Sequence, residues 1–488
     1  MKKLVFLLST LLMLFLSSCS KDKLDSGFTP DPTNVSTLKV ASGVVIPYSP
    51  SGGDDTGGLT DAFNLAKAAG PGSTVQLAKG EYHIGFVLVK EFVGSFKGAG
   101  MGQTIIIPNM NLNNGELYDQ NLAPELLKFL RGDVRISDMS FRNLEGEPSP
   151  GDDLMAFIGI HDWAATELPD LPTDHKIKAV VDHVEFISHP DQVPAGWTPY
   201  TVQTAIGCCG DFFWGNSLPY STVEITITNC TVSEMNWAFA NLSIEKGRLV
   251  FSNNGPINTA GGIWLADNIG GSTLISDNEF NTPPWGNSIT ITDANYTAYG
   301  LNEFKLSDGC QYEISGNVFH TTDAWGAVTI ANDRKAMGII DNKNPVQALI
   351  KSNLFDLHGS VWAGIFNWIT DDAVIRNNKF TGQAKTGVYV DPRTINSLML
   401  GNNFSNLVCS KLELWEPLIF GEGYKIILCG NNNTVVGGGN NSTTVLNLGE
   451  NNKITGAKFV NEGENPLGQT ISDNYRICKE NWIKIRKH

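Results

Sequence analysis

Two aspartates in consecutive repeats of the chain have spacing that suits acid–base chemistry. Asp267 and Asp293 each stand four residues after the first apolar residue of a short alternating segment, and Asn332 holds the same place in the next repeat. Neighbouring parallel strands lie about 4.8 Å apart, so adjacent carboxylates could approach the roughly 5–5.5 Å separation of retaining glycosidases, while residues two coils apart suit the wider inverting arrangement. Mutual repulsion would divide such a pair into acid and base. Asp and Asn are also ordinary turn residues at strand ends, and that structural interpretation stays open.

Four further charged residues follow the same segments and are candidates for catalysis. Asp391 lies one position out of register with the aspartate row, and Arg334, Lys335 and Arg393 leave from the same corner of the repeat. Each of the three basic residues has a simpler interpretation as a solvated loop charge.

Aromatic residues accompany these segments and suit carbohydrate binding. Tryptophan stands just ahead of four of them, as Trp237, Trp285, Trp325 and Trp362. Strand alternation would turn a second set outward as one row, and sugar rings stack on such aromatic surfaces through their apolar faces. The tryptophans could equally fold over neighbouring coils to shield the core. The outward row comprises Trp264, Thr290, Thr329, Phe366 and Tyr389.

The elements that must position these residues are short strands in a longer repeat. An Asn-x-Phe motif recurs five times, at Asn278, Asn317, Asn353, Asn377–Phe380 and Asn402–Phe404, and an alternating segment that begins with a small residue lies between recurrences. Period-two alternation inside a longer repeat predicts a β-solenoid. An Asn at a fixed turn position suits left-handed backbone angles and can bond the equivalent amide one coil away. The following Phe is predicted to stack in the core.

The two halves of the repeat differ in how much their length varies. From each motif Asn to the next alternating segment the chain keeps nearly constant length, whereas the return to the next Asn varies widely. All long insertions therefore leave from one corner, and insertions of this kind build the binding face of a solenoid.

The N-terminal part of the repeat region resembles a known family. Leu59–Ala69 is predicted to be an amphipathic helix that covers an open strand edge. Together with Asp54-Asp55-Thr56, Gly80-Glu81-Tyr82 and Gly98-Ala99-Gly100 it resembles the capping segment of pectin-lyase-like right-handed parallel β-helices. The resemblance implies an all-β fold with an Asn ladder between its second and third sheets. It also implies polysaccharide as substrate, with a basic residue removing a proton beside a uronic carboxylate in the lyases. Neither the acidic signature of polygalacturonase-type hydrolases nor the Arg-Pro pattern of pectate lyases is present.

The first residues predict export and lipid attachment. Lys2 and Lys3 precede an apolar run that ends at Leu16-Ser17-Ser18-Cys19, which resembles the bacterial lipobox. We expect a signal peptide over 1–18, a lipidated Cys19 with a flexible tether over 19–37, and one β-helix domain over 38–488, with its N-terminal cap in 38–110 and a C-terminal cap in 475–488. Residues 20–25 resemble the export signal of Bacteroidetes surface lipoproteins. An ordinary secreted protein is the alternative, and an outer-membrane lipoprotein on the cell surface or the periplasmic face is the expected location.

Charge and cysteine usage narrow the partners. The chain carries a net charge of −15, and removal of Lys2 and Lys3 leaves 33 basic against 50 acidic side chains, a net of −17. An acidic surface repels anionic polymers unless a basic cleft or a bound ion reverses the local potential, so nucleic acid is not expected. No cofactor is required, calcium is the candidate ion, and Asp152, Asp153 and Asp162 are available as ligands. Without Cys19 seven cysteines remain, and their spacing selects no disulfide pair.

The sequence therefore favours a lipid-anchored, monomeric β-helix that binds a polysaccharide along its first sheet and cleaves it as a lyase or a glycoside hydrolase. The membrane is expected to be contacted through the lipid only. A non-catalytic glycan-binding or structural solenoid is the main alternative, and a protein-interaction scaffold is the third. Fold alone does not decide among these functions.

Overall fold

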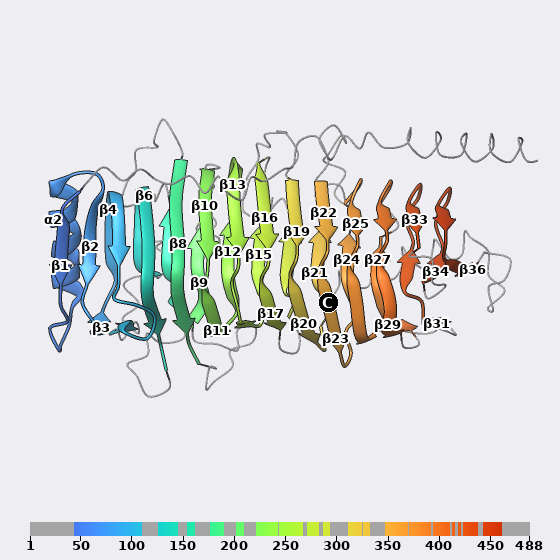
Figure 1. Ribbon diagram of the computed structural model, residues 1–488, viewed down its shortest axis with the longest axis horizontal. Helices are drawn as coiled ribbons and strands as arrows, with labels where there is room; N and C mark the ends of the chain where they lie inside the picture. Colours follow the sequence, from blue (N-terminus) through green and yellow to red (C-terminus); the bar gives the residue numbers. More distant parts are fainter. Residues whose placement is uncertain are drawn as a thin grey trace, which may run out of the picture. The chain divides into compact units, whose positions relative to one another are not determined.

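The computed structural model shows a right-handed parallel β-helix (Figure 1), which agrees with the solenoid that the repeat predicts and with the fold that the resemblance implies. It describes residues 43–109, 125–144, 154–161, 176–189, 202–208, 221–242, 244–266, 271–282, 286–292, 311–324, 326–331, 347–368, 370–391, 394–409, 412–414, 418–420, 423–437 and 443–460. The predicted signal peptide, tether and C-terminal cap lie outside these ranges. Within the described ranges no helix is long and apolar enough to cross a membrane.

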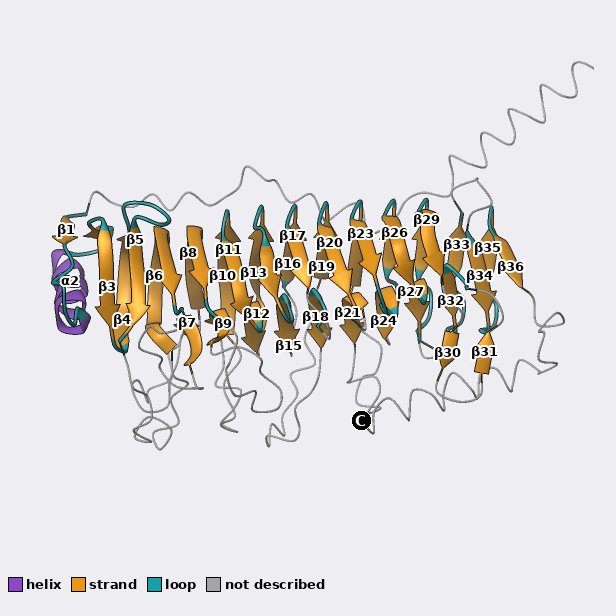
Figure 2. Ribbon diagram, turned by 90° about the horizontal axis from the view of Figure 1, so that it is seen from below, coloured by secondary structure: helices purple, strands orange, loops and turns teal. Residues whose placement is uncertain are grey.

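Helix α2 (Thr56–Ala69), the one helix among the described residues, packs on the first strands at one end of the coil stack (Figure 2). Its buried face consists of Leu59, Ala62, Phe63 and Ala66, which recur at helical spacing. The predicted helix is thus confirmed, with three additional residues at its start. The Phe63 ring lies 5.3 Å from Phe92 and 5.1 Å from Phe96, so the helix closes the apolar interior of the first coils.

The strands form three parallel faces, here called the first, second and third sheets, which are joined where long strands turn the corners. The first sheet contains the start of β4 (Val87–Lys97) and of β6 (Glu125–Arg142), then β7 (Leu154–His161), β9 (Val202–Cys208), β12 (Trp237–Leu242), β15 (Ile263–Ala266), β18 (Ile289–Thr292), β21 (Gly326–Ala331), β24 (Ala363–Trp368), β27 (Thr386–Val390), β32 (Ile426–Leu428), β34 (Thr444–Asn447) and β36 (Lys458–Val460).

The second sheet contains β1 (Val45–Tyr48), β2 (Ser73–Leu77), parts of β4, β6 and β8 (Lys176–Ile187), then β10 (Ser221–Thr228), β13 (Ile244–Ser252), β16 (Ser272–Ser276), β19 (Gln311–Ser315), β22 (Gln347–Lys351), β25 (Val374–Arg376), β28 (Leu398–Leu400), β33 (Thr434–Val436) and β35 (Lys453–Thr455). The third sheet contains β3 (Gly80–Ile84), β5 (Thr104–Pro108), the ends of β6 and β8, then β11 (Thr231–Met235), β14 (Ile257–Thr259), β17 (Glu279–Thr282), β20 (Val318–Thr322), β23 (Leu354–His358), β26 (Lys379–Ala384) and β29 (Asn403–Cys409). An antiparallel pair, β30 (Leu412–Leu414) and β31 (Leu418–Phe420), stands apart from the three sheets.

The predicted Asn ladder runs along the corner between the second and third sheets. The Oδ1 atom of Asn317 accepts from the backbone N–H of Asn278 at 3.0 Å and from its Nδ2 at 2.9 Å, and Asn353 does the same for Asn317. One detail of the prediction is wrong. The left-handed backbone angle belongs to the residue before each ladder Asn, as at Ser352 with a φ of 56°, because the ladder amide must turn inward.

The motif phenylalanines stack inside the coil, as predicted. Ring centroids are separated by 5.2 Å between Phe280 and Phe319, by 4.9 Å between Phe319 and Phe355, and by 4.7 Å between Phe355 and Phe380. All four rings are fully buried. The spacing follows the distance between coils, so the stack continues the strand register through the core.

The cysteines within the described ranges are mostly buried. Cys230 is 2% exposed, and burial raises the pKa of its thiol to about 12. Cys429 is disulfide-bonded, a pairing that the sequence did not select.

Candidate functional site on the first sheet

The outer face of the first sheet carries one continuous row of register-matched residues, here called the outer row. Strand pairing links Trp264 to Thr290, Thr290 to Thr329, Thr329 to Phe366, and Phe366 to Tyr389. These five are the residues that alternation turned outward in the sequence. Toward the N-terminal end the same row continues through Ala240, Gly207, Gly159 and Lys128. Figure 2 shows the strands of this sheet following one another along the stack.

The C-terminal part of the aromatic row is packed rather than open. The Phe366 ring lies 4.7 Å from Tyr389 and 5.2 Å from Trp362, and its side chain is only 4% exposed. Trp362 and Tyr389 also contact a second apolar cluster outside the coil interior, made of Tyr424, Ile427, Cys429, Leu446 and Leu448. Here the structure agrees with the interpretation of tryptophan as a cover over neighbouring coils.

The pair formed by Trp237 and Trp264 is more accessible. Their ring centroids are 5.3 Å apart with an interplanar angle of 31°, and both side chains are half-buried. Ala240, which separates Trp264 from Gly207 in the outer row, is also half-buried. The predicted residues Trp285 and Trp325 lie outside the described ranges.

Among the predicted charged residues only Asp391 is described. It is fully buried at the end of β27, where its backbone N–H donates to the Asn367 carbonyl at 3.0 Å and its carbonyl accepts from Thr394 at 3.0 Å. The position is that of a turn residue at a strand end. Asp267, Asp293, Asn332, Arg334, Lys335 and Arg393 lie outside the described ranges, and so do Cys19 and the possible calcium ligands Asp152, Asp153 and Asp162. Over the described residues, no group of three or more His, Cys, Asp or Glu side chains is arranged to hold a metal ion.

The structure reveals an ionic cluster that the sequence did not predict. Both carboxylate oxygens of Glu125 lie 2.8 Å from His161 Nε2, and Lys128 Nζ lies 3.9 Å from Glu125 Oε2. Glu125 is 6% exposed, His161 7% and Lys128 9%. Burial raises the pKa of the Glu125 carboxyl, but the attraction of His161 and Lys128 outweighs it, so that the net shift is downward and the group is a carboxylate at neutral pH.

Glycines next to the cluster make room for it. A Cβ placed on Gly159 would overlap the Glu125 carboxylate, and a Cβ on Gly207 would lie 3.4 Å from Glu125 Oε1. The carboxylate therefore lies flat over the outer row, above a strand position that only glycine can occupy without displacing it. Beyond it, Gly207 and Ala240 continue the row with small, half-buried residues.

The cluster and the tryptophan pair belong to the same surface. Strand pairing aligns Glu125 with Ala156, Ala156 with Thr204, and Thr204 with Trp237. Three coil steps of about 4.8 Å thus separate the carboxylate's strand position from that of Trp237. Both positions therefore lie on one line along the coil axis.

One signal in the sequence could have located the cluster. Gly159 and Gly207 interrupt apolar strands, and glycine inside a strand marks a place where another group approaches the backbone closely. The sequence did not indicate which group approaches these glycines, because Glu125 and His161 are 36 residues apart and belong to different coils.

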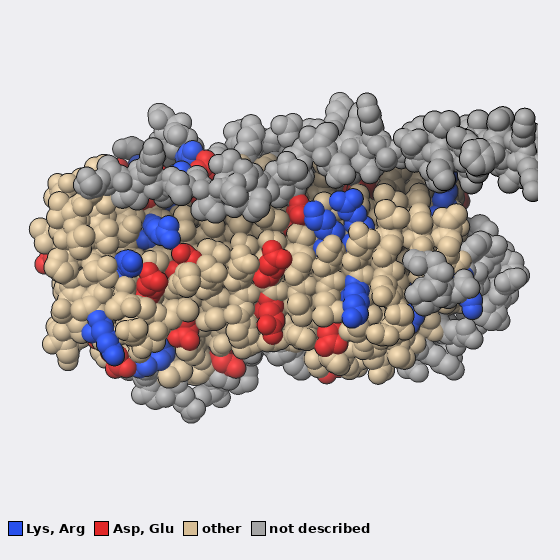
Figure 3. Space-filling view, viewed as in Figure 1, with Lys and Arg blue, Asp and Glu red and all other residues tan. Residues whose placement is uncertain are grey.

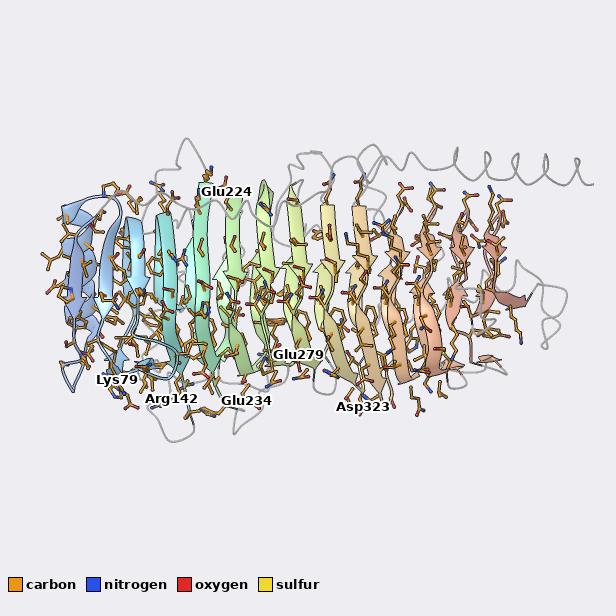
Figure 4. All side chains as sticks on the ribbon, viewed as in Figure 1. Lys79, Arg142, Glu224, Glu234, Glu279 and Asp323 are labelled. Atoms are coloured by element: carbon orange, nitrogen blue, oxygen red, sulfur yellow. The ribbon has the colours of Figure 1, made fainter. Side chains whose placement is uncertain are left out.

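Basic and acidic side chains also form ion pairs on other sheets. On the second sheet Lys176 Nζ and Lys178 Nζ lie 3.0 Å and 3.5 Å from the carboxylate oxygens of Glu224, which Figure 4 shows at the upper edge of the stack. The face seen in Figure 3 mixes acidic and basic residues without a continuous basic stripe.

Comparison with known proteins finds similarity to solved structures. No family model matches, and no curated protein matches. Similar solved structures include DFA-IIIase from Arthrobacter chlorophenolicus A6 (13% identity, TM-score 0.42, 80% of this chain and 93% of that one). They also include the A-module of mannuronan C-5 epimerase AlgE6 from Azotobacter vinelandii (16%, 0.38, 85% and 93%) and the Streptococcus pneumoniae surface protein and adhesin PfbA (11%, 0.40, 76% and 98%). Identities and scores of this size assign no activity, and the fold rests on the strand pairing of this chain itself.

Proposed function

We propose that this protein binds a polysaccharide along the outer face of its first sheet and processes it there. The observation that carries the proposal is the outer row itself, which runs in unbroken register from Lys128 to Tyr389. It joins a half-buried tryptophan pair, a stretch of small residues and an ionic cluster on one face. Linear polymers of sugars are long enough to contact all three.

The tryptophan pair is the binding element of this proposal. Two aromatic rings close together offer a broad apolar surface for sugar faces. The side chains at Ala240 and Gly207 are small and rise little above the sheet. A polysaccharide chain stacked on Trp264 can therefore continue over them toward the cluster. Trp362, Phe366 and Tyr389 contribute mainly to packing in this proposal, because their rings contact one another.

A polysaccharide panel tests the proposal. The full chain is examined by affinity electrophoresis in gels containing neutral or acidic polymers, and its products are measured by reducing ends and by ultraviolet absorbance of unsaturated sugars. Binding without products would support the non-catalytic alternative.

Replacement of Trp264 by Ala is expected to weaken binding of the retained polymer about tenfold, which corresponds to about 1.4 kcal/mol. The matched control is Val408→Ala, an exposed apolar residue on the third sheet. If no polymer retards the protein, or if both variants bind as the unaltered chain does, the proposal is wrong.

Attachment to a membrane through a lipid on Cys19 completes the proposal. The lipobox-like junction supports lipid attachment. A lipid anchor would hold the β-helix outside the cytoplasm, where it could encounter polysaccharides. Detergent phase partitioning of the chain expressed with its signal tests the attachment, with Cys19→Ala as the variant that should move to the aqueous phase.

A further inference from the structure

Cys429 forms a disulfide whose partner follows from the geometry of the coil stack. It stands directly after β32, is 1% exposed and is disulfide-bonded. The other cysteines of the described ranges are free, namely Cys208, Cys230 and Cys409. The partner is therefore one of the cysteines outside those ranges, which are Cys19, Cys209, Cys310 and Cys478.

Cys209 is too far from Cys429 along the coil axis. It directly follows Cys208, and strand pairing in register leads from Cys208 to Leu428 through β12, β15, β18, β21, β24, β27 and β32. These seven steps of about 4.8 Å amount to about 34 Å. The Cα atoms of disulfide-bonded cysteines are no more than about 7 Å apart, and one residue extends the reach by only about 3.8 Å.

Cys310 is excluded for the same reason. It directly precedes β19, and pairing leads from β19 through β22, β25 and β28 to β33, which belongs to the coil of Cys429. Four steps correspond to about 19 Å along the axis. This separation is again larger than a disulfide and one further residue can span.

Cys478 is within reach of Cys429. The chain leaves the first sheet at Val460, which is aligned with Leu446 and through it with Ile427, two steps or about 10 Å away. Cys478 comes 18 residues after Val460, and an extended chain of that length spans about 60 Å. The remaining candidate, Cys19, is the residue whose sulfur is predicted to carry the lipid.

The surface next to Cys429 is apolar and lies on the outer side of the sheet. Ile427 and Leu446 continue the outer row beyond Tyr389, so their side chains face away from the coil interior. They are nevertheless only 3% and 6% exposed. The outer face of a parallel sheet is buried when other chain segments pack on it. The second apolar cluster therefore needs a covering segment.

The end of the chain has the composition for such a cover. Apolar residues stand on both sides of Cys478, and burying them together with the cluster would remove apolar surface of both from water. These residues are Tyr475, Ile477, Trp482, Ile483 and Ile485.

We propose that Cys478 is the disulfide partner of Cys429 and that residues 461–488 return from β36 over the first sheet as a strap that covers the second apolar cluster. The bond forms when the two thiols lose two protons and two electrons to an external disulfide, which is reduced to two thiols. Such oxidants act outside the cytoplasm. The strap does not depend on polysaccharide binding, so a failure of the proposed function leaves it standing.

Peptide mapping of the unaltered full chain tests the pairing. The protein is isolated from an oxidising compartment, its free thiols are blocked with iodoacetamide, and it is digested with trypsin without reduction. Cleavage after lysine and arginine places the two cysteines in residues 426–453 and 477–479, and neither peptide contains another cysteine. We expect these two peptides to be linked and to separate on reduction. A link from residues 426–453 to Cys19, Cys209 or Cys310, or an alkylated Cys429, would overturn the inference.

A set of variants tests whether the two cysteines act as one bond. Cys429→Ala, Cys478→Ala and the double variant should lower the denaturant midpoint of unfolding by similar amounts, because each breaks the same link. The matched control is Cys409→Ala, which removes a free, half-buried thiol and should keep the linked peptides. Losses that add up in the double variant would show that the two cysteines are independent and would contradict the pairing.

Binding of the apolar dye 8-anilinonaphthalene-1-sulfonate tests the cover. Cys478→Ala should increase the dye fluorescence, because release of the strap exposes a contiguous apolar patch. Ile427→Thr in the same background should reverse part of the increase, and Cys409→Ala should bind dye as the unaltered chain does. If Cys478→Ala leaves the dye signal unchanged, residues 461–488 do not cover the cluster and the strap is refuted even where the peptides are linked.

Discussion

At the scale of single residues, one glycine position on the first sheet leaves space for the side chain of a residue on the neighbouring strand. Gly159 is buried in the outer row, and the Glu125 carboxylate occupies the space that a side chain there would fill. Because Gly159 has no side chain, the Glu125 carboxylate can lie over the strand backbone and contact His161. Glycine at this place reflects the cluster rather than backbone geometry.

Replacement of Gly159 by Ala is expected to destabilise the protein by about 1–3 kcal/mol, the usual cost of overpacking, because the Cβ overlaps the Glu125 carboxylate. Denaturant unfolding measures the change in free energy. Gly207→Ala is the control, since its Cβ would make an ordinary contact at 3.4 Å. The combination of Gly159→Ala with Glu125→Ala should recover part of the loss, and equal losses for the two single glycine variants would contradict the explanation.

At the scale of elements, the Asn ladder joins the coils at one corner. The amide of Asn353 donates to the Ile314 carbonyl at 2.9 Å and to Asn378 at 2.9 Å, while its oxygen accepts twice from Asn317. The side chain is 2% exposed, so every one of these groups would be left buried without a partner if the amide were removed. This arrangement keeps the ladder half of the coil constant in length and leaves variation to the other corner.

Replacement of Asn353 by Ala should therefore cost about 3 kcal/mol, because unsatisfied buried groups cost about 1–3 kcal/mol each and adjacent coils share the damage. Asn258→Ala is the control, since this half-buried amide makes bonds of 2.8 Å and 3.5 Å on the third sheet. Chemical unfolding of both variants gives the comparison. A loss at Asn353 no larger than the loss at Asn258 would show that the ladder does not stabilise the coil stack.

At the scale of the whole molecule, each coil contacts mainly its neighbours, so the ends need protection. Open strand edges invite pairing with other chains, and terminal repeats of solenoids require caps. At the N-terminal end α2 supplies the cap through Phe63, whose ring also lies 5.8 Å from Phe129. The stability of the first coils thus depends on one amphipathic helix.

Replacement of Phe63 by Asp is expected to detach the cap and cause association of the exposed coils, because a charge would be buried among Phe92, Phe96 and Phe129. Size-exclusion chromatography with light scattering measures the associated fraction. Leu65→Asp changes the opposite face of the same helix, where the side chain is 59% exposed, and should leave the protein unassociated. A Phe63→Asp variant that behaves like the Leu65→Asp variant would contradict the capping role.

The sequence by itself determined the fold of this protein. Each coil repeats the same pattern, which consists of an Asn at one corner, a Phe two residues later and an alternating strand. The fold prediction therefore rests on several coils and does not depend on any single one. Repetition therefore predicted the register of Trp264, Thr290, Thr329, Phe366 and Tyr389 on one face. The predicted aspartate row and all three basic candidates lie outside the described residues and stay predictions.

Only the tertiary structure decided which residues of that face stand open and which polar groups meet. Phe366 and Trp264 look alike in the repeat, yet Phe366 is packed and Trp264 is half-buried, because exposure depends on what covers each coil. Glu125 and His161 do not belong to the recurring motif, because they lie in the less regular early coils. Their contact depends on stacking two coils in exact register over Gly159, a long-range condition that no local pattern encodes.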